Sequence, residues 1–434
     1  MNYLKYSNLA FENINIIKNI QNQIFCKHLN YSIENSPFYK NKFKNLNLKN
    51  FTLSDISSLP LTSKKDLELF TDSFLACAKN QIADIVHTSG TSGKKIFFKY
   101  SDLDLKRLAY NEQSALNSIL KPSDTVLLTC TMDRCFIAGL AYYSGCRALG
   151  CTIIRNGAST FRSSMNLIDE LKPNVIIGVP SYIYKLGKFM ENQNISQSKN
   201  SIKKLICIGE PIREWQEDHK TTTLSANSIC KKIESIWQAK VYSTYALTET
   251  VTTFCECNAG QGGHLIPELA YVEIINEKGQ ILPHGEDGEV VITPFFTHAM
   301  PLIRYQTGDI ARIIDTPCTC GRKSLRLGPI TGRKFQMLKV KGTKIYPNSI
   351  YPILDSVENV NLYRLIAEKN NISDKLTIEL SLKDNSTNAI EQISDLLHAY
   401  LRIRIKLIIV DNSKLKSQIF PPGTRKPLKY IEKF

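Results

Sequence analysis

The sequence has 434 residues, of which 43% are hydrophobic and 22% charged, as is typical of a globular protein with two or three domains. Its formal net charge of +15 comes from lysines spread along the whole chain, without the clustered basic residues of a nucleic-acid-binding protein. No apolar stretch reaches the length of about 18 residues that spans a bilayer, and the N-terminus lacks the pattern of a signal peptide. We therefore expect no nucleic-acid partner, no membrane partner and a cytoplasmic location.

Residues 1–80 show helical amphipathic patterns, interrupted by a loop expected around residues 36–39. From about residue 82 to 300, short runs of Val, Ile and Leu alternate with helical stretches. Continuous apolar strands of this kind are typical of a parallel sheet that helices cover on both faces. The runs lie at residues 125–129, 174–178 and 204–209.

From about residue 268 the pattern becomes β-rich, with strands expected at 271–275 and 289–293. After about residue 335, alternation resumes with a strand at 375–382, a helix at 388–401 and a strand at 407–410. These patterns predict an α/β protein. Its large layered N-terminal domain, with a β-rich subdomain, covers residues 1–333, and a small α+β domain covers 334–434.

A loop rich in glycine and hydroxyl residues, His-Thr-Ser-Gly-Thr-Ser-Gly-Lys-Lys at 87–95, follows an apolar run at 82–86. Glycine lets backbone N–H groups approach phosphate oxygens, and hydroxyl and ammonium groups add donors. Only two residues separate the glycines, so the loop does not fit the Walker A spacing. An exposed turn is the alternative interpretation. The candidate phosphate-binding residues are Thr88, Ser89, Gly90, Thr91, Ser92, Gly93 and Lys94.

Three further groups of polar residues follow apolar strands or glycine turns. Gly209, Glu210 and Pro211 come directly after a strand, where open α/β sheets bind their ligands. Glu249 also follows an apolar strand and would hold Mg²⁺ against phosphate oxygens. Asp309 follows a glycine turn and could accept hydrogen bonds from ribose hydroxyls. Each of these features alone also fits an ordinary turn or a solvated charge.

In this order along the chain, the motifs resemble the adenylate-forming superfamily of acyl-CoA synthetases, adenylation domains and luciferases. Within it, the sequence looks most like the phenylacetate–CoA ligase family, and the likeness runs from about residue 30 to the end. The segments that carry the resemblance, beyond the loops above, are 36–39, 59–67, 301–309 and 318–322.

The resemblance implies a two-step reaction and a role for each motif. A carboxylate attacks the α-phosphate of ATP to give acyl-AMP, and a thiol, usually that of coenzyme A, then displaces AMP. Loading of a carrier protein's phosphopantetheine, or of another acceptor, is the alternative second step. The resemblance implies that Lys64 and residues 88–94 bind the β- and γ-phosphates, Thr248 the α-phosphate and Glu249 the Mg²⁺ ion. For the nucleoside, it implies that Asp309 binds ribose beside Arg333, and that adenine is bound by Gly209, Glu210, Pro211 and Tyr245.

The catalytic lysine of the family matches Lys426, although Lys429 is also conceivable because the local pattern departs from Gly-Lys-x-x-Arg. The C-terminal domain would be a mobile lid that rotates between the two steps. Its hinge carries Phe335 and Gln336 where relatives carry aspartates, which keeps the carrier-protein alternative open beside coenzyme A. The residues that the resemblance places at the organic acid are Phe136, Ala138, Gly139, Tyr182 and Ala246.

Four further residues, Cys257, His264, Cys318 and Cys320, resemble a zinc site found in part of this family. Four nitrogen and sulfur ligands give closed tetrahedral coordination, which is typical of a structural rather than a catalytic Zn²⁺ site. Cys255 could replace Cys257, and reduced surface thiols are the alternative interpretation. Family members are often dimers, so a homodimer is possible.

Overall fold

The computed structural model describes residues 3–88, 96–157, 159–193, 201–218, 221–370, 373–421 and 427–433. The chain divides into two compact units, the first made of residues 1–226, 230–307 and 311–329, and the second of 227–229, 308–310 and 330–434. Across the described residues, none of the helices combines the length and apolarity needed to cross a membrane.

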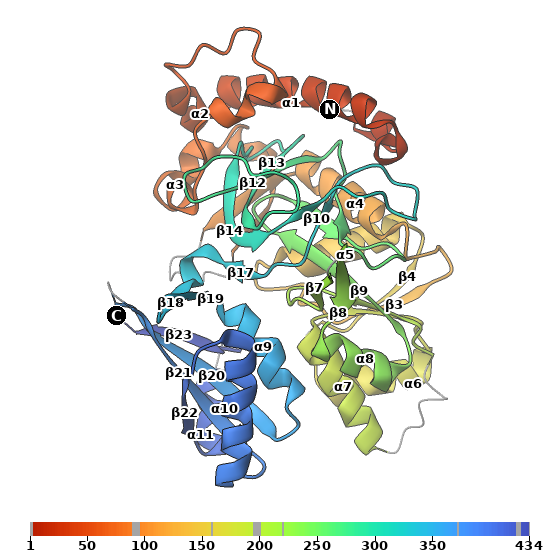
Figure 1. Ribbon diagram of the computed structural model, residues 1–434. Coiled ribbons are helices and arrows are strands. Elements are labelled where there is room, and N and C mark those ends of the chain that lie inside the picture. The colour runs from red at the N-terminus through yellow and green to blue at the C-terminus, as the bar shows by residue number, and fades with distance from the viewer. Residues whose placement is uncertain are drawn as a thin grey trace. The chain divides into compact units, whose positions relative to one another are not determined.

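The first unit is built on a nine-stranded sheet in the order β15-β16-β11-β10-β9-β6-β5-β3-β4 (Figure 1). The five strands from β9 to β4 are parallel, and the remaining pairings are antiparallel. The strands are β3 (Thr125–Leu128), β4 (Thr152–Arg155), β5 (Val175–Gly178), β6 (Lys204–Cys207), β9 (Lys240–Leu247), β10 (Thr252–Cys255), β11 (Gly263–His264), β15 (Ile313–Ile314) and β16 (Arg326–Leu327). The predicted parallel strands are therefore present.

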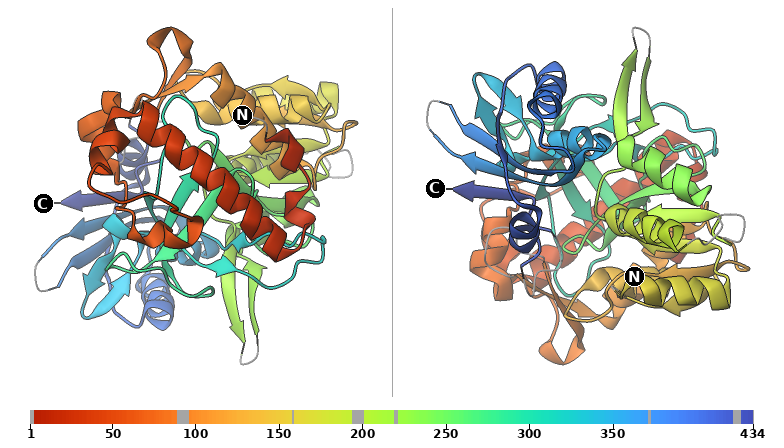
Figure 2. Two further views of the ribbon diagram at one scale, coloured as in Figure 1. Left: turned by 90° about the horizontal axis from the view of Figure 1, so that it is seen from above. Right: turned by 90° about the horizontal axis from the view of Figure 1, so that it is seen from below.

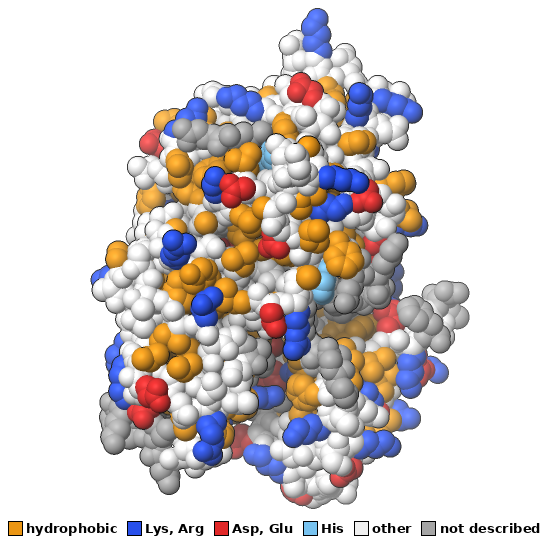
Figure 3. Space-filling view, turned by 180° about the vertical axis from the view of Figure 1, so that it is seen from behind, with side chains coloured by type: hydrophobic (Ala, Val, Ile, Leu, Met, Phe, Trp, Pro, Cys, Tyr) orange, Lys and Arg blue, Asp and Glu red, His pale blue; other side chains and the backbone are white. Residues whose placement is uncertain are grey.

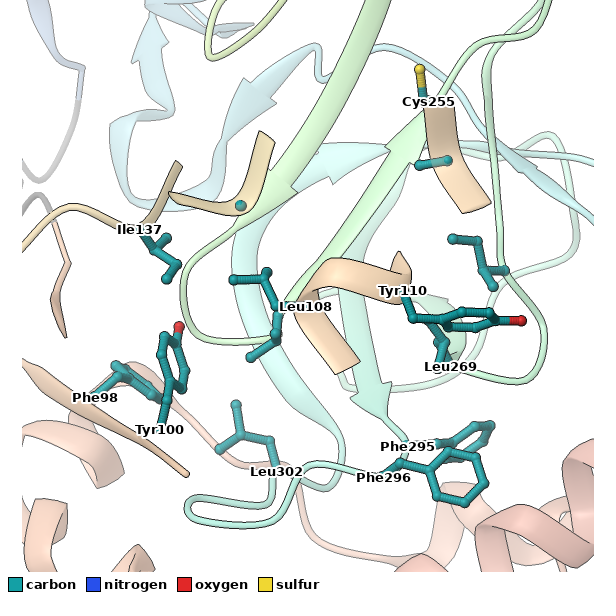
Figure 4. Packing of buried hydrophobic residues seen from close by; sticks show 14 of the residues in the cluster. Phe98, Tyr100, Leu108, Tyr110, Ile137, Cys255, Leu269, Phe295, Phe296 and Leu302 are labelled. Carbon is teal, nitrogen blue, oxygen red and sulfur yellow. The ribbon is translucent and has the colours of Figure 1, made fainter. Parts of the chain in front are cut away.

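Helices cover both faces of the parallel strands, which explains why those strands are apolar throughout (Figure 1). Helices α4 (Asp102–Leu116) and α5 (Ile137–Ala148) lie on one face. Helices α6 (Phe161–Leu171), α7 (Pro180–Asn192) and α8 (Ser228–Trp237) lie on the other. Leu108, Tyr110 and Ile137 from α4 and α5 join the main hydrophobic core, which Phe295 and Leu302 close from the β-rich side (Figure 4).

The N-terminal part of the chain is helical. The predicted loop at 36–39 is wrong, because only Ser36 separates two helices there. Helix α1 (Ile14–Asn35) ends before Ser36, and Pro37 immediately begins α2 (Pro37–Lys42). Proline is favoured at a first helical position because its missing N–H has no intrahelical partner there. Helix α1 crosses one side of the first unit (Figure 2). The next α-helix in the sequence is α3 (Lys64–Phe70).

Smaller sheets complete the first unit. Strands β12 (Ala270–Ile275), β13 (Gly288–Pro294) and β14 (Tyr305–Ala311) form the predicted β-rich part. Strands β1 (Ile82–His87) and β2 (Phe97–Ser101) pair on either side of the glycine loop. Strands β7 (Arg213–Asp218) and β8 (Thr221–Ala226) make a hairpin that projects from the unit (Figure 2).

The second unit has a four-stranded sheet in the order β22-β21-β20-β23. Its apolar core joins α9 (Pro347–Ser356) and α10 (Thr387–Leu401) to the sheet, and α11 (Asn412–Ile419) contacts β20 and β21. Its strands are β18 (Leu338–Val340), β19 (Thr343–Ile345), β20 (Val360–Glu368), β21 (Lys375–Leu382), β22 (Lys406–Ile409) and β23 (Tyr430–Lys433), and β17 (Gly332–Arg333) pairs with residues 309 and 310 of β14. The predicted strand at 375–382 matches β21.

The charge pattern on the face seen in Figure 3 agrees with the sequence. Lysine and arginine side chains are scattered there among acidic and hydrophobic ones, and they form no continuous basic surface (Figure 3).

Candidate active site and metal centre

The predicted polar groups of the first unit gather at the carboxyl ends of parallel strands. Strands β6 and β9 are neighbours and run in the same direction, so the residues after Cys207 and after Leu247 emerge at the same edge. Open α/β sheets bind ligands at this edge, because the connecting loops leave a crevice there.

The loop after β6 holds Gly209 and Glu210. Gly209 is exposed with φ +74, and an added Cβ would meet nothing within 4 Å, so conformation rather than space favours glycine. The Glu210 carboxylate accepts hydrogen bonds from the N–H and the hydroxyl of Ser181, at 3.0 and 2.9 Å. It therefore caps the first turn of α7.

The turn between β9 and β10 carries Thr248 and Glu249. The Tyr100 hydroxyl donates to the Thr248 carbonyl at 2.6 Å, and the Tyr305 hydroxyl lies 3.4 Å from Glu249 Oε1. The side chains of Thr248, Glu249 and Tyr245 are partly exposed, and Ala246 is exposed. A partly exposed carboxylate can ligate a hard cation such as Mg²⁺.

Lys64 is connected to the same region through the backbone. Thr62, two residues before it, donates its N–H to the Arg304 carbonyl at 2.9 Å and accepts one from Gln306 at 2.8 Å. These bonds place the start of α3 beside Tyr305, whose hydroxyl reaches Glu249.

In the second unit, Asp309 and Arg333 face each other across β14 and β17. The Arg333 Nε donates to Asp309 Oδ1 at 3.0 Å, and the Asp309 side chain is almost fully buried. Gly308 before it has φ +74, and the Phe335 ring lies 3.4 Å from where its Cβ would be. The bond holds the Asp309 carboxylate in a defined orientation.

Of the predicted phosphate-binding loop at 87–95, the structure describes His87 and Thr88. Thr88 is buried, its hydroxyl has no hydrogen-bond partner within the described residues, and its N–H bonds to the Ile96 carbonyl at 3.1 Å. The other predicted residues of this loop, Ser89, Gly90, Thr91, Ser92, Gly93 and Lys94, lie outside the described residues, as does Lys426.

Lys429, the alternative catalytic lysine, is held within the second unit. Its Nζ donates to the Tyr363 hydroxyl at 2.7 Å and lies 3.7 Å from Asp355 Oδ1. It also lies 4.3 Å from the centre of the Tyr363 ring and 5.5 Å from that of Tyr351. Its ammonium group therefore already has a hydrogen-bond partner, an ionic partner and two aromatic faces.

The residues predicted at the organic acid come from three elements. Phe136 and Ala138 at the start of α5 are partly exposed. Gly139 is buried, and a Cβ there would lie 2.3 Å from the Thr131 carbonyl oxygen, so only glycine lets α5 approach this loop. Tyr182 lies in α7, and its hydroxyl is 2.7 Å from that of Ser164 in α6, so this hydrogen bond joins the two helices.

The four predicted metal ligands converge in the first unit. The donor atoms of Cys257, His264, Cys318 and Cys320 all lie within 4.8 Å of one another. Cys257 Sγ is 3.5 Å from Cys318 Sγ, and Cys320 Sγ is 3.4 Å from His264 Nε2. The alternative ligand Cys255 is buried and is not part of this group.

The ionisable groups of this cluster are shifted in different directions when no metal ion is present. Burial lowers the pKa of His264 to about 3, so its imidazole is neutral at physiological pH, as metal binding requires. Burial raises the pKa of Cys257 to about 12, so this thiol would lose its proton on binding a metal ion. For Cys320, burial is outweighed by hydrogen bonds from Arg322 and the neighbouring thiols, which lower its pKa. Three thiolates and a neutral imidazole are a donor set that Zn²⁺ prefers.

Three residues that hold the candidate site were not found from the sequence. Tyr100 and Tyr305 bond to the turn that carries Thr248 and Glu249, and Arg107 donates to the Val251 carbonyl. Arg107 occurs in an amphipathic helical pattern, where a charged residue normally indicates the solvent face. No local signal marks it as buried.

The fold is that of a layered α/β protein with polar residues at its strand ends, and comparison with known proteins gives its family. Residues 38–294, more than half of the chain, match the family model of the AMP-binding enzymes. The chain belongs to this family. The predicted adenylate-forming resemblance is thereby confirmed, and with it the reaction class, an AMP-forming ligase that activates a carboxylic acid and transfers it to a thiol.

Several curated proteins are similar to the chain over most of its length. The phenylacetate-coenzyme A ligase of Thermus thermophilus is 29% identical over 428 residues, 94% of this chain and 93% of that protein. That of Escherichia coli is 28% identical over 402 residues, 90% and 88% of the two chains. Protein CapK of Staphylococcus aureus is 23% identical over 394 residues, 84% and 82%.

Solved structures confirm the predicted α/β fold. A 2-hydroxyisobutyryl-CoA ligase in the postadenylation state superposes with a TM-score of 0.81 at 20% identity, covering 96% of this chain and 89% of that one. The same ligase in the thioesterification state gives 0.67.

Proposed function

We propose that the protein converts an aryl carboxylic acid to its coenzyme A thioester through an acyl-adenylate. The relatives named as phenylacetate-coenzyme A ligases, similar over about nine-tenths of the chain, support the acid class and the acceptor. The observation that carries the adenylation step is the convergence of the loops after β6 and β9 at one sheet edge.

In the first step, a carboxylate oxygen forms a bond to the α-phosphorus of ATP, and the bond to pyrophosphate breaks. Charge develops on the α-phosphate oxygens, so donors arranged there beforehand stabilise the transition state. We assign this role to the Thr248 hydroxyl and to the Lys426 ammonium. Glu249 would ligate Mg²⁺, which neutralises phosphate charge, and residues 88–94 with Lys64 would hold the β- and γ-phosphates.

The nucleoside would be bound by the remaining predicted residues. Gly209, Glu210 and Pro211 border adenine with Tyr245, and Asp309 accepts hydrogen bonds from the ribose hydroxyls. The Asp309–Arg333 pair supports this role, since the 3.0 Å bond orients the buried carboxylate. The pocket for the acid would include Phe136, Ala138, Gly139, Tyr182 and Ala246.

In the second step, the coenzyme A thiolate attacks the acyl carbonyl, and AMP leaves with the oxygen that the carboxylate contributed. Residues 334–434 would act as a mobile lid between the steps. We choose Lys426 over Lys429 as the catalytic lysine because the Lys429 ammonium is already engaged by Tyr363 and Asp355.

We also propose that Cys257, His264, Cys318 and Cys320 bind one structural Zn²⁺. The mutual distances of their donor atoms, all within 4.8 Å, support this assignment. Tetrahedral coordination by four protein ligands leaves no open position for a substrate, so the metal would stabilise the fold. None of the twelve cysteines, all within the described residues, is in a disulfide, which also supports a reducing, cytoplasmic location.

The test is acid-dependent exchange of pyrophosphate into ATP over a panel of aryl and aliphatic acids, followed by addition of coenzyme A. We expect exchange with an aryl acid and formation of its thioester. Exchange with aliphatic acids alone would contradict the acid class. Exchange without thioester formation would contradict coenzyme A as acceptor and favour a carrier protein.

A further inference from the structure

The turn that presents Thr248 and Glu249 contains an unusual backbone conformation. Strands β9 and β10 pair Leu247 with Thr252, so residues 248–251 form a four-residue connection. Val251, its last residue, has φ +50. A β-branched side chain in this left-handed region is crowded by its own backbone, so the conformation must be held by other contacts.

Arg107 of α4 supplies such a contact from within the core. Its Nη1 donates to the Val251 carbonyl, and its Nη2 donates to the Thr252 hydroxyl at 3.3 Å. The same guanidinium donates to the carbonyls of Leu269 and Phe295, at 2.7 and 2.6 Å. Arg107 is fully buried, and these four acceptors are carbonyl and hydroxyl oxygens rather than carboxylates.

The turn is also held at its other end. The Tyr100 hydroxyl donates to the Thr248 carbonyl at 2.6 Å, and the Thr252 hydroxyl donates to the Thr250 carbonyl at 2.9 Å. Tyr100 stays protonated because burial raises its pKa well above the ordinary value. The two residues thus fix the carbonyls at both ends of the turn and leave the side chains of Thr248 and Glu249 partly exposed.

We propose that Arg107 is a positioning residue that holds Val251 in its left-handed conformation and thereby orients Thr248 and Glu249 toward Mg·ATP. This inference rests on the proposed nucleotide role of these two residues. Without the guanidinium, Val251 relaxes to a negative φ, and the Glu249 carboxylate, two residues earlier in the turn, loses its orientation. Arg107 itself is too deeply buried to contact the nucleotide.

The test combines Arg107→Lys with Val251→Gly. Lysine keeps the charge but cannot reach four acceptors arranged around a planar guanidinium. We expect Arg107→Lys to raise the dissociation constant of Mg·ATP about 10-fold, while the KM of the acid changes less than about twofold. Glycine adopts positive φ without steric cost, so Val251→Gly in the Arg107→Lys background should restore Mg·ATP binding to within about threefold of wild type.

The rescue separates positioning from a general packing role, because glycine at 251 cannot replace the lost bonds to Leu269 and Phe295. Arg147→Lys, at an exposed arginine of α5, is the matched control and should bind Mg·ATP like wild type. An Arg107→Lys variant with unchanged Mg·ATP affinity would overturn the proposal, as would a defect that Val251→Gly leaves unrelieved.

If Arg107→Lys does not fold, Arg107→Gln serves instead, because its amide keeps a polar donor at this position but cannot bond to all four acceptors. We then expect the same loss of Mg·ATP affinity and the same relief by Val251→Gly, and unchanged affinity would overturn the proposal. Binding is measured by equilibrium dialysis, independently of turnover. A wild-type protein that fails to bind Mg·ATP would refute the proposed function itself, which distinguishes that outcome from failure of the Arg107 assignment.

Discussion

The proposed metal centre and the proposed nucleotide site of this protein are assembled in different ways. The four donors at Cys257, His264, Cys318 and Cys320 point at one another from three separate segments, with all ligand atoms within 4.8 Å. The nucleotide residues are instead spread along strand ends, and each is oriented by a different neighbour. Glu210 is bonded to Ser181, for example, and the Thr248 carbonyl to Tyr100.

This difference reflects the chemistry of the two ligands. A bare Zn²⁺ ion needs four soft donors around a single point, so the donors must be close together. A nucleotide is extended and is recognised by separate groups at its base, ribose and phosphates, so its residues need precise individual orientation. We therefore expect substitutions at the nucleotide site to change activity at constant stability, and those at the metal centre to do the reverse.

The largest effect is expected at the catalytic lysine. Lys426→Ala should lower acyl-AMP formation by at least about 10²-fold, because it removes the cation that stabilises charge on the α-phosphate. The melting temperature should stay unchanged. Lys429→Met, the matched control, should retain adenylation and instead lower stability, since it removes the contacts with Tyr363 and Asp355. Stopped turnover in the Lys429 variant, with normal turnover in the Lys426 variant, would reverse the assignment.

Asp309→Asn should have the next largest effect. The amide keeps the shape of the side chain but weakens the bond to Arg333 and the proposed bonds to ribose hydroxyls. We expect the KM of ATP to rise about 10-fold and the KM of the acid to remain unchanged, as measured by initial rates. If both KM values rose together, Asp309 would have a structural role instead.

Loss of the metal should affect stability more than chemistry. We expect about one Zn²⁺ per chain by elemental analysis, and removal by a chelator should lower the melting temperature by about 5–10 °C. Cys320→Ser should have the same effect, whereas Cys255→Ser should retain the metal because Cys255 lies outside the donor group. Equal metal content in the two variants would contradict this ligand set.

The smallest expected effect is a pH dependence of stability from a buried carboxyl of α4. Burial raises the pKa of Glu112 from 4.5 to about 7 in the folded state. The folded protein therefore binds this proton more tightly than the unfolded chain, and stability decreases as the pH rises from about 5 to about 7.

Glu112→Gln removes this ionisation and keeps an acceptor for the Thr253 hydroxyl. We compare the unfolding free energy of the variant with that of wild type at each pH. This difference should shift in favour of the variant by about 1–3 kcal/mol between pH 5 and pH 8. Urea unfolding at both pH values measures this gain. The exposed Glu34→Gln should show none, and a Glu112→Gln variant with the same pH dependence as wild type would contradict a raised pKa.

The parallel strands, the β-rich segment and β21 could be predicted from the sequence because a buried strand is recognisable from its composition alone. The proximity of Cys257, His264, Cys318 and Cys320 could be predicted because two close cysteines with an upstream cysteine and histidine resemble a zinc site of part of the family. The role of Arg107 could not, since its four acceptors come from residues 251, 252, 269 and 295, which only the fold brings together. The helix at Pro37 was missed because proline both ends and begins helices.

The central claim is that a carboxylate oxygen attacks the α-phosphate of ATP, and isotope transfer tests it most directly. The protein is incubated with ATP, coenzyme A and an aryl acid labelled with ¹⁸O in its carboxylate, and the products are analysed by mass spectrometry. We predict that one ¹⁸O atom appears in AMP for each thioester formed. Label in inorganic phosphate, with ADP as the nucleotide product, would contradict the account.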